Sequence, residues 1–163
     1  MNQMRPVVLL ALALLAACSP SNHAAEAVHP MGDPVQAGPL VYTVLEADWL
    51  NQLGSGHEAK WPKNRFLVVR LSIENIGNKE VNLPLLSVLN GNKQETLELD
   101  NGDGVDEWLG LMRPITPATT THGKIVFDVP SGNYALRLTN GASPEDEKFS
   151  YVAIPLKLNA LSQ

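Results

Sequence analysis

Four acidic side chains gather in the segment 100–107, namely Asp100, Asp103, Asp106 and Glu107. Calcium takes oxygen ligands from flexible loops, and a loop that alternates aspartate with glycine can supply them. The spacing departs from the EF-hand pattern, which needs Asp-x-Asp-x-Asp-Gly and a glutamate at the twelfth position. Asparagine, glycine and aspartate also favour plain turns. The segment is therefore either a calcium or other metal loop, or a solvated turn between strands.

Residues that could catalyse hydrolysis are scattered along the chain. Ser55, His57 and Glu58 are close in sequence, but neighbours in one loop seldom form the oriented constellation that nucleophilic catalysis needs. Glu46 and Asp48 could pair with Glu58 as the two carboxylates of a glycosidase, although any acidic protein offers such pairs. His23 and His29 fall in a predicted tether, while His57 and His122 fall in predicted loops. We expect no enzyme and no cofactor, with a cell-wall hydrolase or hydrolase inhibitor as an alternative.

Three tryptophans, Trp49, Trp61 and Trp108, lie in or beside predicted loops. An exposed indole ring can anchor a protein partner or stack on a sugar. It can equally close the open end of a β-sandwich core. The binding hypothesis requires Trp49 or Trp61 to be exposed.

The single cysteine, Cys18, follows a basic residue, an apolar run at 7–15 and two alanines, which is the pattern of a secretory signal. Nine apolar residues are too few to span a bilayer, which takes about 20. The segment resembles the lipobox of bacterial lipoproteins, whose cysteine is lipidated and becomes the mature N-terminus. The resemblance implies a signal peptide at 1–17 and a lipid anchor, such as palmitate, on Cys18. The residue after the cysteine is Ser19, which is not acidic. In this respect the chain resembles lipoproteins that are sorted to the periplasmic leaflet of the outer membrane.

The charge balance limits the possible partners. The chain has 12 basic and 17 acidic residues, for a net charge of −5. Nucleic-acid binding needs a basic footprint, so we expect no nucleic-acid partner. Adhesion to anionic lipid is disfavoured for the same reason. Contact with the membrane should come from the anchor alone, which leaves an envelope protein or glycan as the possible partner.

The chain after residue 38 has the pattern of β-strands separated by turns. In the stretch 65–75, alternate apolar residues face one way, while the other face begins apolar at Phe66 and Val68 and then turns polar. This predicts a core strand covered on both faces at one end. The segments 124–129 and 134–138 predict a hairpin. Helical turns are expected at most at 48–53 and 106–112. The other expected strands are 40–47, 81–88, 94–99 and 149–158.

These elements predict an all-β protein, an antiparallel sandwich of about seven or eight strands. The segment 18–32 is expected to be a flexible tether and 33–160 the folded domain. The stretches 64–81, with its Glu-Asn-x-Gly turn, and 116–130, with Phe-Asp-Val-Pro, resemble a bacterial family of exported, often lipid-anchored domains of unknown function.

That resemblance implies an immunoglobulin-like sandwich, similar to a secreted mycobacterial immunoprotective antigen, and brings no catalytic residues. The label "telomeric repeat-binding factor" on some members does not suit an acidic exported chain. We therefore expect a non-catalytic binding or assembly module of the cell envelope.

Overall fold

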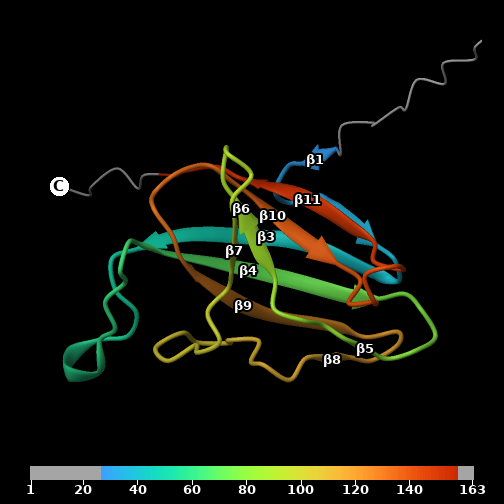
Figure 1. The fold of residues 1–163 in the computed structure, drawn as a ribbon. Coiled ribbons are helices and arrows are strands. Elements are labelled where there is room, and N and C mark those ends of the chain that lie inside the picture. Colours follow the sequence, from blue (N-terminus) through green and yellow to red (C-terminus); the bar gives the residue numbers. More distant parts are fainter. Residues whose placement is uncertain (1–26, 158–163) are drawn as a thin grey trace, which may run out of the picture.

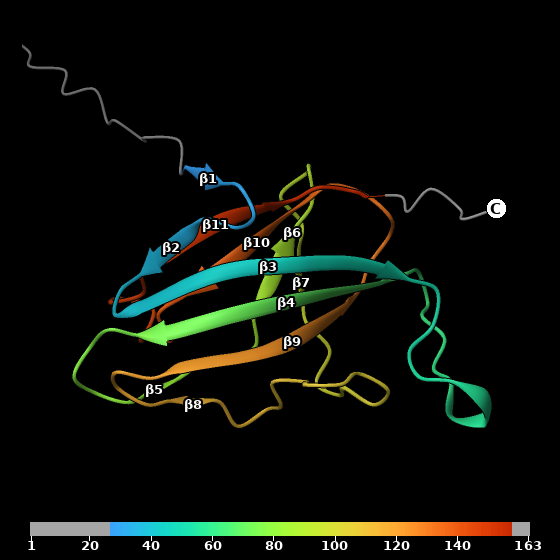
Figure 2. The ribbon, with the colours of Figure 1, turned by 180° about the vertical axis from the view of Figure 1, so that it is seen from behind.

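The computed structural model describes residues 27–157, which form two packed β-sheets (Figures 1 and 2). The all-β sandwich expected from the sequence is confirmed. Sheet A has the strand order β1 (Val28–His29), β11 (Phe149–Ile154), β10 (Tyr134–Thr139), β6 (Ser87–Leu89) and β7 (Glu95–Leu97). Sheet B has the order β2 (Pro34–Ala37), β3 (Leu40–Leu50), β4 (Phe66–Asn75) and β9 (Thr120–Asp128). A short pair, β5 (Val81–Asn82) and β8 (Pro114–Ile115), stands apart from both.

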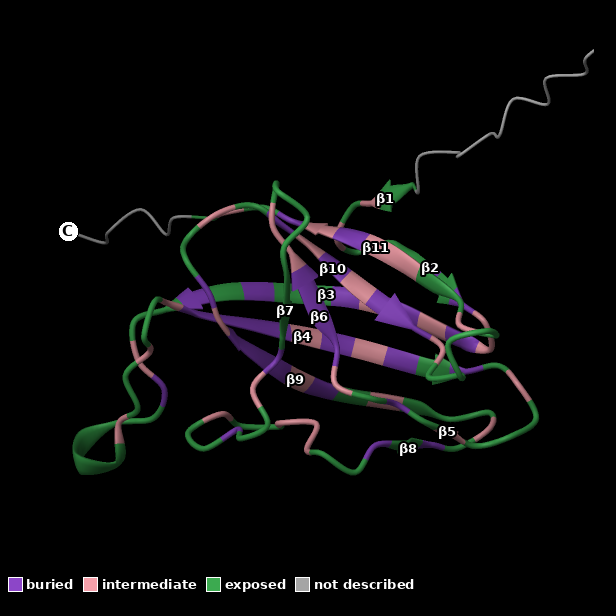
Figure 3. Cartoon of the chain, in the orientation of Figure 1, coloured by how far each residue is buried: buried purple, intermediate pink, exposed green. Residues whose placement is uncertain are grey.

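The main core lies between the two sheets, as the purple bands in Figure 3 show. On β4, the alternate residues Leu67, Val69, Leu71 and Ile73 are completely buried, as their period-two spacing predicts. Tyr42 of β3 crosses the core, and its hydroxyl donates to a backbone carbonyl of β10. Burial strongly raises the pKa of the Tyr42 phenol, so the phenol stays protonated and remains a donor.

The hairpin predicted for 124–129 and 134–138 is wrong. β9 pairs with β4 in sheet B, whereas β10 pairs with β11 and β6 in sheet A. The turn between β9 and β10 crosses from one sheet to the other. Tyr134 starts β10, and its hydroxyl donates to the carbonyl of Pro130 at 2.8 Å, which is the tyrosine corner of immunoglobulin-type sandwiches. The orders β3-β4-β9 and β11-β10-β6-β7 likewise match strands A-B-E and G-F-C-C′ of that fold.

Several boundaries differ from the sequence expectation. The expected strand 81–88 is divided into β5 and β6, which belong to different sheets, because Pro84 cannot donate to a ladder. β3 passes a bulge after Val44 and continues to Leu50, so the helical turn expected from residue 48 is wrong. The one helical turn between residues 27 and 157 is the 3₁₀ turn η1 (Gly56–Glu58). β1 lies within 18–32, the segment that the sequence predicted to be a flexible tether. It forms a strand there because it pairs in parallel with β11.

A second, smaller apolar cluster covers the outer side of sheet B at one end. It contains Leu53, Phe66, Val68 and Val126, with Leu99 and Val105 packed against them. This is the doubly covered end of β4 predicted from Phe66 and Val68. The cover consists of the loop 51–65 and the segment 98–113, which together carry the candidate site.

Candidate functional site

Two loops that are distant in sequence meet at one end of the sandwich. Leu53 and Lys60 exchange two backbone hydrogen bonds, at 2.9 and 2.8 Å, which close the loop 51–65. The Lys60 ammonium reaches the Asp103 carboxylate of the acidic segment at 3.7 Å. Gly104 lies so close to Gly54 that a Cβ at position 104 would fall 2.7 Å from the Gly54 nitrogen. Only glycine fits there, and its positive φ of 81° requires glycine as well.

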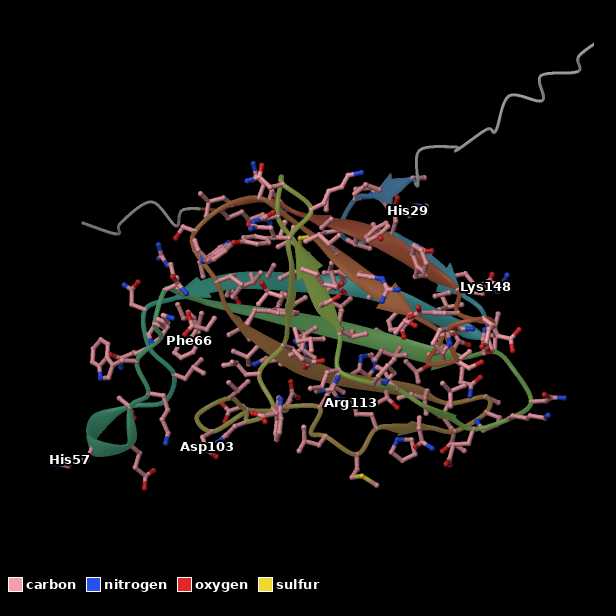
Figure 4. All side chains as sticks on the ribbon, in the orientation of Figure 1. His29, His57, Phe66, Asp103, Arg113 and Lys148 are labelled. Carbon is pink, nitrogen blue, oxygen red and sulfur yellow. The ribbon has the colours of Figure 1, made fainter. Side chains whose placement is uncertain are left out.

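Between these loops lies an open, polar cleft of about 850 Å³. Figure 4 shows His57 and Asp103 at this corner, with Phe66 of the apolar cluster above them. The cleft brings together residues of both sequence candidates, the 54–58 loop and the acidic segment. Its lining consists of Gly54, Ser55, His57, Glu58, Lys60, Asp103, Gly104, Val105 and Asp106.

The acidic side chains do not converge on a metal position. Asp103 is held by Asn101, whose side-chain oxygen accepts from the Asp103 amide at 2.7 Å, while Glu107 points to Arg70 at 3.6 Å. Asp106 lines the cleft, and Asp100 is not among its lining residues. Within residues 27–157, no three His, Cys, Asp or Glu side chains lie close enough to hold a metal ion. The geometry is that of a solvated turn, so the calcium alternative finds no support.

The three tryptophans have different environments. Trp49 is only 4% exposed and packs in the main core with its ring centre 6.0 Å from that of Tyr134, so the expectation that it could be exposed is wrong. Trp108 lies against Gly102 and holds the acidic turn in place. Trp61 follows Lys60 of the cleft and is 70% exposed. It is the one predicted anchor whose ring is open to a partner.

The residues considered for catalysis are not assembled. Ser55, His57 and Glu58 are exposed, and in the described part of the chain no hydrogen bond links their side chains. His122 lies within β9 rather than in a loop, and His29 lies in β1 at the far end of the molecule (Figure 4). An activated nucleophile needs an adjacent, oriented base, which this arrangement does not supply.

Sequence reasoning did not find the ion pair that closes the base of the segment 98–113. The Arg113 guanidinium binds the Glu98 carboxylate through two hydrogen bonds, at 2.6 and 2.8 Å, and both side chains are fully buried. Glu98 also accepts from the amide of Leu86. A glutamate in an alternating strand and an arginine in a loop give no local signal of such a pairing.

The family model described as "Domain of unknown function (DUF4352)" matches residues 29–149. The chain belongs to this family. No curated protein matches the sequence of this DUF4352 domain significantly. Among the described residues there is no helix long and apolar enough to cross a membrane.

Solved structures share the fold at low sequence identity. The yjhA protein from Bacillus subtilis is 16% identical, with a TM-score of 0.58 over 77% of this chain and 99% of its own. The candidate lipoprotein ycdA from Bacillus subtilis is also 16% identical, with a TM-score of 0.60, but the match spans 77% of this chain and 39% of ycdA. A functionally unknown protein from Listeria monocytogenes is 10% identical with a TM-score of 0.56, over 80% of this chain and 85% of its own.

Proposed function

We propose that this chain is a lipid-anchored, non-catalytic binding module of the cell envelope, and that its contact surface is the loop end with the polar cleft and Trp61. The observation that carries the proposal is the position of Trp61, which is 70% exposed directly beside a cleft residue. A large, exposed indole ring next to polar groups is typical of surfaces that bind a protein or a glycan.

The anchor in this proposal is Cys18, which lies outside the described residues, as do 1–17 and Ser19. The signal pattern of the sequence supports it, and so does the fold shared with a candidate lipoprotein. Ser19 favours the periplasmic leaflet of the outer membrane as the site of insertion.

The anchored end and the loop end lie apart. In Figures 1 and 2, β1, where the described chain begins, and η1, in the middle of the 51–65 loop, are at opposite corners of the sandwich. A domain tethered through its β1 end can therefore present the cleft and Trp61 away from the membrane.

The anchor is tested by replacing Cys18 with serine. We expect the wild-type chain to take up a palmitate label and to sediment with membranes, and the C18S chain to do neither, because acyl chains supply the membrane affinity. A C18S chain that still sediments with membranes contradicts the anchor.

The contact surface is tested by chemical crosslinking in intact envelopes and by cosedimentation with purified cell-wall glycan. We expect Trp61→Ala to weaken capture by about tenfold or more, as the loss of a central anchor does. Met112→Ala is the matched control, because Met112 is exposed and does not line the cleft. Equal capture by the two variants and the wild type would remove the loop end from the proposal.

A further inference from the structure

A second, smaller hollow adjoins the polar cleft at the loop end. Its volume is about 170 Å³, and its floor belongs to the small apolar cluster on sheet B. Figure 4 shows Phe66, from this floor, and Asp103, from the polar cleft, at the same corner of the molecule. We call this hollow the apolar pocket; its lining consists of Leu53, Lys60, Phe66, Leu99, Asn101 and Asp103.

The ion pair of Lys60 and Asp103 joins the two spaces, because both residues line the polar cleft as well as the apolar pocket. Asp103 also accepts a hydrogen bond from the side chain of Asn101 at 3.1 Å. The cleft and the pocket therefore form one composite site, with a polar part and an apolar part that meet at a neutralised pair. A ligand that fills both parts must itself have a polar and an apolar group.

The polar part of this site carries negative charge. Glu58 and Asp106 line it, and within residues 27–157 neither carboxylate has an ion-pair or side-chain hydrogen-bond partner. Lys60 also lines it, but Asp103 already neutralises the Lys60 ammonium. The exposed ring of Trp61, which follows Lys60, can attract a cation through its face. A positively charged group on the ligand is therefore favoured.

The apolar part distinguishes a peptide from a glycan. A sugar ring carries hydroxyl groups around its edge, and a floor of leucine and phenylalanine offers them no hydrogen-bond partner, which makes their burial costly. An apolar side chain has no such cost, and an apolar space of about 150 Å³ can hold a benzene ring. In an extended peptide, neighbouring side chains point to opposite sides, so two neighbours can reach the two parts of the site.

We propose that the composite site binds an extended segment of a partner protein, with one apolar side chain in the apolar pocket and a neighbouring lysine or arginine at Glu58 and Asp106. This rests on the proposed function, in which the loop end is the contact surface, and it narrows the partner to a protein with a basic segment. Because the charges involved are exposed to solvent, added salt weakens the contact. The lipid anchor is not needed for it.

The test is an NMR titration of the chain 18–163 carrying Cys18→Ser. The probe is the peptide acetyl-Lys-Leu-Lys-amide, and we expect it to shift the methyl signals of Leu53 and Leu99 together with the amide signals of the 54–58 loop. Acetyl-Lys-Ala-Lys-amide should bind about fivefold more weakly, because it buries less apolar surface. Acetyl-Glu-Leu-Glu-amide should bind about tenfold more weakly, because its charges are repelled. The disaccharide diacetylchitobiose is the glycan probe and should leave the two methyl signals unchanged.

Two pairs of variants assign the two parts of the site. Asp106→Asn should weaken binding of the Lys-Leu-Lys peptide about threefold, whereas Asp33→Asn, at an exposed aspartate outside the site, should not. Leu99→Ser should abolish the preference for the leucine peptide over the alanine peptide. Leu97→Ser is its control, because Leu97 is 59% exposed and lines neither space.

Equal binding of the leucine and alanine peptides, or of the basic and acidic peptides, overturns the inference. The absence of any shift up to about 20 mM peptide does so as well. Shifts caused by diacetylchitobiose alone also overturn it and make the loop end a glycan contact. The proposed function is tested separately by Trp61→Ala. If that variant loses capture while the peptides fail to bind, only the peptide inference falls.

Discussion

The two sheets of this sandwich present different outer faces to their surroundings. On sheet B, the end of the face where β4 begins is apolar and lies under the loops 51–65 and 98–113, while the remaining open part carries Arg70, Ser72, Glu74 and His122. On sheet A, the outer face mixes polar side chains, such as Arg137, Ser87 and Glu95, with the exposed apolar residues Val28, Leu97 and Phe149. The chain thus covers a continuous apolar cluster on one outer face with loops, and leaves only single apolar side chains exposed on the other.

The largest expected effect comes from the ion pair that closes the base of the cover on sheet B. Arg113→Met should lower the free energy of unfolding by about 3–5 kcal/mol, because it leaves the buried Glu98 carboxylate without its partner. Urea denaturation measures this. Lys60→Met, which removes a surface pair with Asp103, is the control and should change stability by less than about 1 kcal/mol.

A double variant separates the two contributions of this pair. Replacing Glu98 by leucine together with Arg113→Met should recover much of the lost stability, since no buried charge remains. A double variant as unstable as Arg113→Met alone would mean that the pair acts through packing.

The apolar end of sheet B gives the next effect. Phe66→Ala should cost about 3 kcal/mol, because it removes the largest side chain of the small cluster and leaves a cavity. Ser72→Ala, on the same strand and face but at the open part, should change stability by about 0.5 kcal/mol or less. Thermal unfolding measures the stability lost in each variant. Equal losses would show that the covered end of β4 contributes no more to stability than its open part.

A smaller effect is expected in the acidic turn of the cover. A Cβ at Gly102 would collide with the ring of Trp108, so Gly102→Ala should destabilise the protein by about 2 kcal/mol and shift the tryptophan fluorescence. At Gly91 a Cβ meets nothing within 4 Å, which makes Gly91→Ala the matched control. An unchanged spectrum in Gly102→Ala would mean that Trp108 does not hold the turn.

The smallest effect concerns the ion pair of Arg137 and Glu147 on the outer side of sheet A, and it depends on pH. Hydrogen bonds from Thr139 and Arg137 lower the pKa of Glu147 below its ordinary value of 4.5. A lowered carboxyl pKa stabilises the fold above the ordinary value, and this contribution is lost as the pH falls through the folded value. Glu147→Gln should therefore lose about 1 kcal/mol or less at neutral pH, and the difference from wild type should shrink as the pH falls below 4.5.

Urea denaturation at several pH values measures this difference. Glu80→Gln is the control, because Glu80 is exposed and makes no side-chain hydrogen bond within residues 27–157. A difference between wild type and Glu147→Gln that stays constant with pH would contradict the role given to the carboxylate.

Local patterns predicted the strands well and their partners poorly. The alternation in 65–75 identified β4, its inward face and the covered end at Phe66, since these follow from neighbouring residues. The prediction of a hairpin at 130–133 was wrong because the same local sequence suits both a tight turn within one sheet and a connection between two sheets. The tyrosine four residues after Pro130 was the available signal for the crossing.

The candidate site shows the same limit. Exposure of Trp61 agrees with its place in a predicted loop, whereas Trp49 became buried because β3 continues past the bulge at Val44. The meeting of the loops at Gly54 and Gly104 depends on contacts between distant parts of the chain. No spacing along the sequence encodes such a meeting. The lipid anchor at Cys18 remains a prediction.

The parallel pairing of β1 with β11 has a consequence for biogenesis. Among the described strands β1 comes first, and it can pair only after β11, the last of them, has been made, so this edge of sheet A forms late. Contacts between such remote segments also form slowly. A truncation before Phe149 should therefore leave the edge of β10 unpaired and sheet A sensitive to protease.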